Sequence, residues 1–152
     1  MNGIAKPYKV YIQNNIKIGV FGLGIQLTGL VNKSEYGETV WHHPIEIAQE
    51  MTRILKEDLK CDIIICLSHL GYKYTSSEMV SDVVLATQTK DIDLIIGGHT
   101  HTFLDKPTIV LNQDNKEVII NHAGCFGVRV GQIDLYLDEY KNKRTVSKVI
   151  TV

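Results

Sequence analysis

The sequence is poor in the residues that would mark a disulfide-rich or thiolate-bound metal protein. Its 152 residues include three cysteines and three prolines, and they contain no C-x-x-C pair. An odd number of cysteines argues against a complete disulfide framework, and the missing C-x-x-C spacing argues against a zinc site built on thiolates. We therefore expect Cys61, Cys66 and Cys125 to be buried, free, structural cysteines.

Long apolar runs and charge of one sign are absent as well. No window approaches the roughly 20 apolar residues of a transmembrane helix, and the formal net charge is −1. Proteins that bind nucleic acid or anionic membranes need clustered Lys and Arg, so we expect neither partner. The start of the chain also lacks the apolar core of a signal peptide, and the compartment is left unassigned.

What is present fits one α/β domain. The composition is 44% hydrophobic and 22% charged, which is ordinary for a globular protein of this length. Apolar runs at 62–67 and 92–96 predict two strands buried on both faces, and the segment between them predicts a helix capped by Ser76 or Ser77. Together they indicate a βαβ unit.

The segments on either side of this unit are predicted with less regular patterns. Strands are expected at 8–11 and 16–23, followed by a loop over 29–43 and a helix from Pro44 to near Lys60. Short strands separated by turn signals are expected at 108–111, 118–121, 128–137 and 146–152. Their spacing suggests an antiparallel meander and a mixed sheet.

The candidate chemistry lies in three histidines at strand ends. His99 and His101 stand two residues apart in Gly97-Gly98-His99-Thr100-His101-Thr102, directly after a predicted buried strand. His69 follows the other buried strand. The carboxyl ends of strands line the ligand crevice of open α/β sheets, and neutral imidazoles bind divalent transition metals. The spacing therefore predicts a shared metal-binding space.

These motifs, in this order, resemble a known family. A strand ending in Ser68-His69-Leu70-Gly71, followed by a strand ending in the Gly97–Thr102 motif, is similar to the second half of the calcineurin-like metallophosphoesterases, in the 5′-nucleotidase branch. The stretches 18–24 (IGVFGLG) and 130–135 (VGQIDL) fit the same branch. The resemblance implies an α/β fold in which a mixed β-sheet sandwich is flanked by helices in four αββα layers. Residues 1–152 would supply roughly the second half of that domain and would lack its N-terminal half.

The resemblance also implies a site with two divalent metal ions, such as Zn, Mn, Fe or Co. His69 and His99 would bind one ion and His101 the other. The family's remaining ligands come from D-x-H, G-D and G-N-H-[ED] motifs, and this sequence contains none of them. Asn121-His122 does not replace the last motif, because it follows the histidine pair and lacks the flanking Gly and acid. We therefore assign no catalytic residue in this half and leave metal occupancy open.

The implied function is that of a metal-dependent phosphoesterase, a 5′-nucleotidase that hydrolyses nucleoside monophosphates by metal-activated hydroxide. A cyclic-nucleotide phosphodiesterase and a UDP-sugar hydrolase stay open as substrate classes. The isolated chain is expected to be inactive. The alternative is a non-catalytic metal-binding or interaction module that requires a separate first half, as a split-gene product would.

Two partners follow from the same resemblance. The complete enzyme would take a nucleotide or another phosphomonoester, and this chain would either self-associate or pair with the missing N-terminal half, because an unpaired sheet edge promotes association. The complete parent protein could be periplasmic or attached to the cell envelope.

Three other residues receive structural interpretations. His122 is expected to be a hydrogen-bonded structural histidine, and Phe126 is expected to fill the core. Asp93, which opens a predicted strand, is expected to face water.

Overall fold

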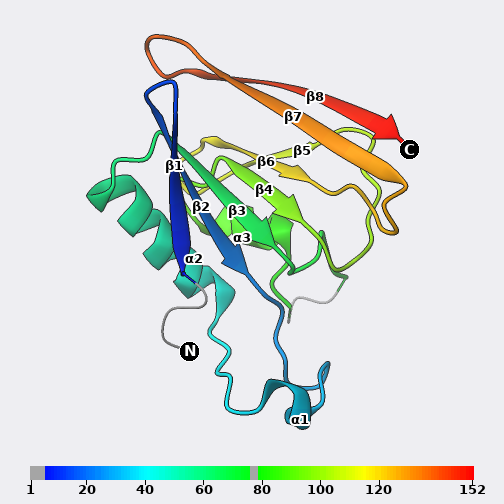
Figure 1. Ribbon diagram of the computed structural model, residues 1–152. Helices are drawn as coiled ribbons and strands as arrows, with labels where there is room; N and C mark the ends of the chain where they lie inside the picture. Colours follow the sequence, from blue (N-terminus) through cyan, green and yellow to red (C-terminus); the bar gives the residue numbers. More distant parts are fainter. Residues whose placement is uncertain (1–5, 76–78) are drawn as a thin grey trace.

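The computed structural model describes residues 6–75 and 79–152 of the chain. Strands and helices alternate through the first two thirds of this range, and strands alone follow (Figure 1). The elements are β1 (Tyr8–Gln13), β2 (Ile16–Leu23), α1 (Lys33–Tyr36), α2 (Pro44–Arg53), the π-helical turn η1 (Ile54–Asp58), β3 (Ile63–Ser68), α3 (Asp82–Gln88), β4 (Leu94–Gly97), β5 (Thr108–Leu111), β6 (Glu117–Asn121), β7 (Arg129–Leu137) and β8 (Lys143–Thr151).

A six-stranded mixed sheet forms the centre of the fold, with strand order β1-β2-β3-β4-β6-β5. The inner strands β2, β3, β4 and β6 run parallel to one another, whereas β1 and β5 pair antiparallel at the two edges. Strands β3 and β4 are the predicted apolar runs, and their neighbours in the sheet leave neither of them at an edge. The βαβ unit predicted from these runs is confirmed.

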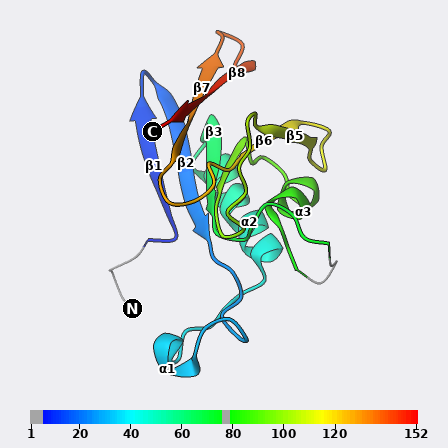
Figure 2. The same cartoon turned by 90° about the vertical axis from the view of Figure 1, so that its right-hand side faces the viewer.

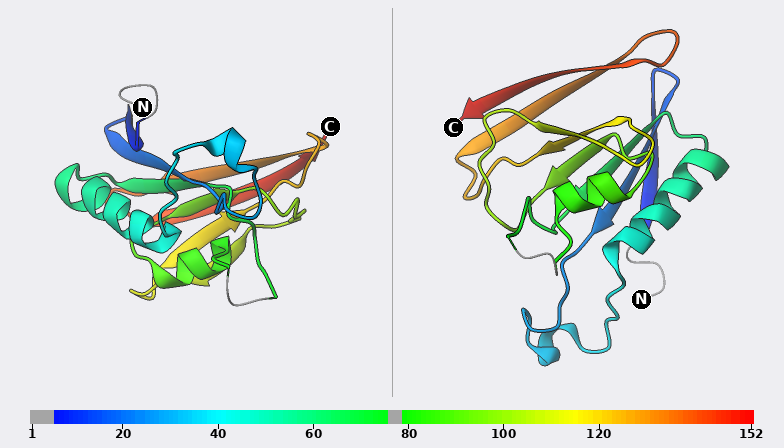
Figure 3. Two further views of the ribbon diagram at one scale, coloured as in Figure 1. Left: turned by 90° about the horizontal axis from the view of Figure 1, so that it is seen from below. Right: turned by 180° about the vertical axis from the view of Figure 1, so that it is seen from behind.

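Helices α2 and α3 cover one face of this sheet (Figures 2 and 3). Alternate strand residues such as Ile64, Cys66 and Ile95 point into this layer and are fully buried. They pack in one apolar cluster with Leu55 from η1 and Leu85 from α3. The predicted helix start at Pro44 is confirmed, and helical structure continues through the π turn to Asp58, close to the predicted end.

The start of α3 differs from the prediction. The helix begins at Asp82, and its N-cap is Ser81, whose side chain accepts a hydrogen bond from the backbone N–H of Val84. The predicted caps Ser76 and Ser77 lie outside the described residues. The stretch 76–82 (SSEMVSD) contains three serines that could cap a helix, and Ser81 is the one directly before the first turn.

The β7–β8 hairpin lies across the opposite face of the sheet (Figures 1 and 2). Two ion pairs attach the hairpin to the sheet. Lys141 contacts the carboxylate of Asp62, just before β3, and Lys143 contacts that of Asp93, just before β4. Asp93 also accepts a hydrogen bond from the backbone N–H of Ile64 at 2.8 Å. The expectation that Asp93 faces water is therefore wrong, because its carboxylate joins β3, β4 and the hairpin.

The predicted antiparallel meander is also wrong. Strands β5 and β6 pair antiparallel, and so do β7 and β8, but β6 inserts between β5 and β4 and runs parallel to β4. Strand β7 then leaves this sheet to form a second, two-stranded one with β8. The predicted fold class holds, since the chain is a mixed α/β structure with two sheets and flanking helices.

Part of the sheet face beside the hairpin remains exposed. Leu67 and Ile96, at the carboxyl ends of β3 and β4, keep 48% and 45% of their surface accessible. Ile109 and Leu111 of β5 and Tyr11 of β1 are exposed as well. In the described ranges no helix is long and apolar enough to cross a membrane.

Candidate functional site

The register of β3 and β4 brings two of the predicted histidines together. These strands are parallel neighbours, and Ser68 at the end of β3 lies opposite Gly97 at the end of β4. The residues that follow them, His69 and His99, therefore leave the sheet side by side. This adjacency is the one that the sequence predicted from two strand ends.

The rings of His69 and His99 meet edge to face, with centroids 5.2 Å apart and planes at 67°. Burial lowers the pKa of His99, and the neighbouring His69 and His101 lower it further. An imidazole in this setting stays neutral and keeps a lone pair for a ligand. The pKa effect also indicates that His101 belongs to the same electrostatic neighbourhood.

The loop that carries His99 and His101 has an unusual backbone. Both residues have left-handed φ angles, 77° and 53°, a conformation that non-glycine residues rarely adopt. Strained backbone of this kind costs on the order of 1–3 kcal/mol per residue and persists only when the surroundings enforce it. The loop is thus held in a specific shape.

His101 is turned toward Phe126, with ring centroids 6.0 Å apart. Phe126 is 90% exposed, so the expectation that it fills the core is wrong. It lies in the turn between β6 and β7, which brings an aromatic ring to the rim of the histidine cluster.

Among the residues that the structure describes, no group of three or more His, Cys, Asp or Glu side chains is arranged to hold a metal ion. The histidines supply neutral donors. Asp93 directly precedes β4, at the end of the strand opposite the His99 loop, and its carboxylate binds the Ile64 amide and Lys143 there. The fit to a metal is therefore partial, with two adjacent imidazoles and no carboxylate among the described groups. The assignment of His69, His99 and His101 as ligands stays a prediction.

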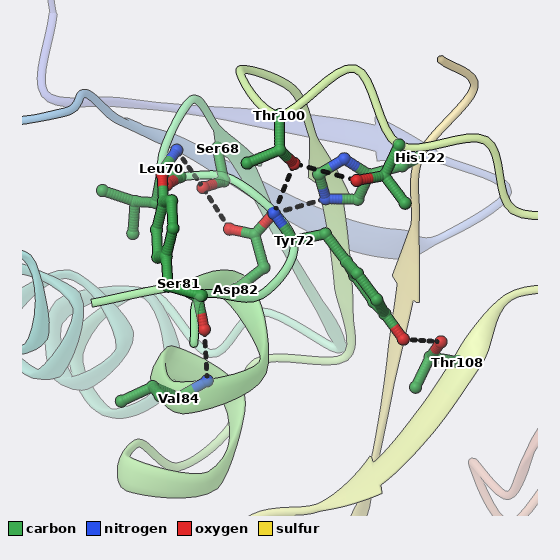
Figure 4. Close-up of polar contacts among 11 residues, drawn as sticks. Ser68, Leu70, Tyr72, Ser81, Asp82, Val84, Thr100, Thr108 and His122 are labelled. Carbon is green, nitrogen blue, oxygen red and sulfur yellow. Dashed lines mark hydrogen bonds and ion pairs between the residues drawn. The ribbon is translucent and has the colours of Figure 1, made fainter. Parts of the chain in front are cut away.

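A buried polar network of Ser68, Asp82 and His122 adjoins the ends of β3 and β4 (Figure 4). The carboxylate of Asp82 accepts hydrogen bonds from the Ser68 hydroxyl and, at 2.6 Å, from Nε2 of His122. The side chains of Asp82 and His122 are 0% and 1% exposed. His122 is the hydrogen-bonded structural histidine that the sequence predicted, whereas Asp82 was not anticipated.

Ser68, Asp82 and His122 are residue types of a hydrolytic triad, but their order excludes that chemistry. In a triad the histidine stands between the serine and the carboxylate and takes the serine proton. Here the carboxylate stands between the serine and His122. The network is therefore structural, because its histidine does not reach the serine hydroxyl that it would have to activate.

A hydrogen bond between the Tyr72 amide and Thr100 joins the two histidine loops, and further bonds lie within each loop (Figure 4). The Thr100 hydroxyl accepts from the backbone N–H of Tyr72 at 3.0 Å and pairs with the Thr102 hydroxyl at 2.9 Å. The Tyr74 hydroxyl donates to the carbonyl of Leu70 at 2.6 Å. The loops after β3 and β4 thus form one cross-linked unit.

The chain is similar in sequence to curated proteins. No family model matches the chain. The chain is 35% identical over 133 residues to the trifunctional nucleotide phosphoesterase protein YfkN of Bacillus subtilis, covering 88% of this chain and 8% of that protein. It is 35% identical over 141 residues to an apyrase of Tabanus yao, covering 83% of this chain and 24% of the apyrase.

Solved structures give the same picture. The 5′-nucleotidase precursor of Thermus thermophilus superposes with a TM-score of 0.77 and 25% identity, covering 99% of this chain and 30% of that one. The calcineurin-like phosphoesterase YfkN of Bacillus subtilis shares the fold with a TM-score of 0.69, at 22% identity, over 98% of this chain and 52% of that one.

The fold and these similarities define the class of protein: the chain is a member of the calcineurin-like phosphoesterases. Within that class it belongs to the 5′-nucleotidase branch. The chain spans 8% of the length of YfkN and 24% of the length of the Tabanus yao apyrase, so it matches only part of these relatives.

Proposed function

We propose that this chain supplies the histidine half of a divalent-metal site in a phosphoesterase that hydrolyses nucleoside monophosphates. The observation that carries the proposal is the adjacency of the His69 and His99 rings, 5.2 Å apart, at the ends of neighbouring parallel strands. The named activities of the relatives, nucleotide phosphoesterase, apyrase and 5′-nucleotidase, support the substrate class.

The proposed ligands are His69 and His99 for one ion and His101 for the second. A lowered pKa of His99 favours this role, because a metal binds the neutral imidazole and must otherwise displace a proton. When bound, a pair of divalent cations would lower the pKa of water and offset the negative charge of the phosphoryl group. The chain's own contribution is to aim the imidazoles and keep their loops in place.

The isolated chain is proposed to be catalytically incomplete. Residues 1–152 would form only the second part of the domain, and the relatives are several times longer than the matched region. Three neutral imidazoles leave the charge of two cations uncompensated, which lowers affinity. Carboxylate ligands would come from a preceding segment.

A partner surface for that segment is available on the sheet face beside the hairpin. Leu67 and Ile96 lie there, each one residue before the end of its strand, and are about half exposed. A first half that covers these side chains would also bring its own groups close to the histidines. Without it, the same apolar surface favours self-association.

The proposal is tested by phosphatase assays. The chain is supplied with Mn²⁺ or Zn²⁺ and given AMP or p-nitrophenyl phosphate, with His99→Ala as the comparison. We expect no turnover above that of the variant. If the unmodified chain hydrolyses the substrate and His99→Ala does not, the proposal that the chain is catalytically incomplete is contradicted. That result would support a functional enzyme in this chain alone.

The association is tested by light scattering after size-exclusion chromatography. We expect dimers or larger species at high protein concentration, and a shift toward monomer when Leu67 and Ile96 are both replaced by Thr. A monodisperse monomer of the unmodified chain would contradict the exposed face as an interaction surface.

A further inference from the structure

We infer that Asp82, with Ser68 and His122, is a positioning group that holds both histidine loops in one geometry. The inference rests on the proposed metal site, because it assigns a role to residues next to the loops of that site. The described hydrogen bonds of the Asp82 carboxylate go to Ser68 and His122 and not to a proposed ligand, so Asp82 acts through the backbone of the loops.

The first loop is held through Ser68. The Ser68 hydroxyl donates to Asp82 and accepts from the backbone N–H of Leu70 at 3.1 Å, so the turn that contains His69 is closed around this hydroxyl. The backbone N–H of Asp82 donates to the carbonyl of Gly71 at 2.8 Å, which ties the end of the same turn to α3. Asp82 therefore binds the His69 loop at two points.

The second loop is held by close packing. A Cβ atom added to Gly97 would lie within 3.0 Å of both His122 Nε2 and the Asp82 carboxylate, a distance that real Cβ atoms essentially never show. The backbone leading to His99 thus runs directly against the Asp82–His122 pair. Because His122 belongs to the segment after β6, the pair fixes this backbone from the α3 side and the β6 side together.

A buried carboxylate lowers stability through the loss of its hydration, and an apolar residue that only filled the core would not carry this penalty. Burying a charged or strongly polar group is unfavourable unless it is fully hydrogen-bonded, and apolar residues of similar volume often stabilise a core as well or better. Asp82 is completely buried and uses both oxygens on groups that adjoin the histidine loops. We attribute its presence to the geometry that these contacts impose on the loops.

The test combines a metal-free measurement with a metal measurement on the full chain. Asp82→Ala is compared with Asp93→Ala, a matched control in which a carboxylate also binds a backbone amide of β3 but at the opposite end of the strands. Ser68→Ala is a milder second variant that removes the side-chain link to the first loop and leaves the backbone link from Asp82 to Gly71 in place. Amide hydrogen exchange is followed without metal, and Zn²⁺ affinity is then measured by calorimetry.

In Asp82→Ala we expect the amides of Leu70, Tyr72 and Thr100 to exchange about 10- to 100-fold faster, as for loss of a charged hydrogen bond. Zn²⁺ affinity should fall about 10- to 100-fold, the usual effect of removing an outer-shell group. Asp93→Ala should change neither quantity, even where it lowers the melting temperature. Ser68→Ala should accelerate exchange at Leu70 but leave Thr100 unchanged.

Three outcomes distinguish this inference from the proposed function. If the unmodified chain binds no Zn²⁺, the proposed metal site is contradicted, and the exchange data alone decide whether Asp82 positions the loops. If loop exchange in Asp82→Ala equals that in Asp93→Ala, the positioning role is overturned, whatever the metal result. If Asp82→Ala does not fold, unchanged exchange at Leu70 in Ser68→Ala overturns it in the same way.

Discussion

Gly97 and His122 are separated by so little space that no side chain could stand at position 97. A Cβ atom at position 97 would lie 2.0 Å from His122 Nε2 and 2.2 Å from an Asp82 carboxylate oxygen, and both of these side chains are buried. The glycine therefore permits a close approach between the end of β4 and the segment after β6. This approach places the His99 loop next to the buried network.

Replacing Gly97 by Ala should destabilise the protein. Overpacking a buried site typically costs about 1–3 kcal/mol, and here the clash is with two hydrogen-bonded polar groups. Gly24→Ala is the matched control, because a Cβ at Gly24 meets nothing within 4 Å. Urea unfolding should show the loss for Gly97→Ala and a change within about 0.5 kcal/mol for Gly24→Ala. Equal stability of the two variants would contradict the close approach.

The Lys141–Asp62 ion pair should make stability depend on pH in the acid range. The hydrogen bond from Lys141 lowers the pKa of Asp62, and the backbone N–H of Lys17 lowers it further. The folded pKa thus lies below the unfolded value of about 3.9, so the contribution is fully present above that value and is lost as pH falls through the folded pKa.

Asp62→Asn should therefore be less stable than the unmodified protein near neutral pH, and the difference should shrink as the pH falls below the unfolded pKa. Lys141 is largely exposed, so added salt should also shrink it. Thermal unfolding at a series of pH values measures both effects. A difference that grows toward low pH would contradict the assigned sign.

The three cysteines should differ sharply in reactivity. Burial raises the pKa of the Cys66 thiol strongly, and it also raises the pKa of Cys61. Cys125 is only partly buried, which corrects the expectation that all three are core residues. A thiol reagent at mildly alkaline pH should modify one cysteine quickly in the folded protein and all of them in denaturant. Rapid modification of Cys66 in the folded state would contradict its place in the core.

The Ser81 cap should stabilise α3. Ser81→Ala removes the acceptor of the Val84 N–H and should cost about 1 kcal/mol of unfolding free energy. Thr87→Ala, on the exposed side of the same helix, is the control and should change stability by less than about 0.5 kcal/mol. Denaturant titration distinguishes the two variants, and equal effects would argue against the cap.

The sequence predicted those parts of the fold that are encoded by neighbouring residues or by motifs at the ends of strands. The continuous apolar runs of β3 and β4 predicted buried parallel strands, and their common edge predicted that His69 and His99 would meet. The helix start at Pro44 followed from a local preference of proline for the first turn.

The parts that could not be predicted depend on contacts between distant segments. The turns around β5 and β6 indicate hairpins but do not reveal that β6 inserts beside β4, since that pairing joins residues far apart in the sequence. Asp82 looks like an ordinary first-turn acid of a helix, and only the fold brings Ser68 and His122 to it. The one feature of the sequence that could have drawn attention to Asp82 is that it is a single acidic residue within an apolar stretch.

The central claim is that His69, His99 and His101 converge to bind divalent metal, and Zn²⁺ calorimetry on single alanine variants tests it most directly. His43→Ala is the control, because His43 lies outside the cluster at the start of α2. We predict that His69→Ala and His99→Ala each weaken binding by more than about 100-fold, beyond the roughly 10- to 100-fold effect of outer-shell groups, and that His43→Ala binds as the unmodified chain does. Equal Zn²⁺ affinity in all of these proteins would contradict the claim.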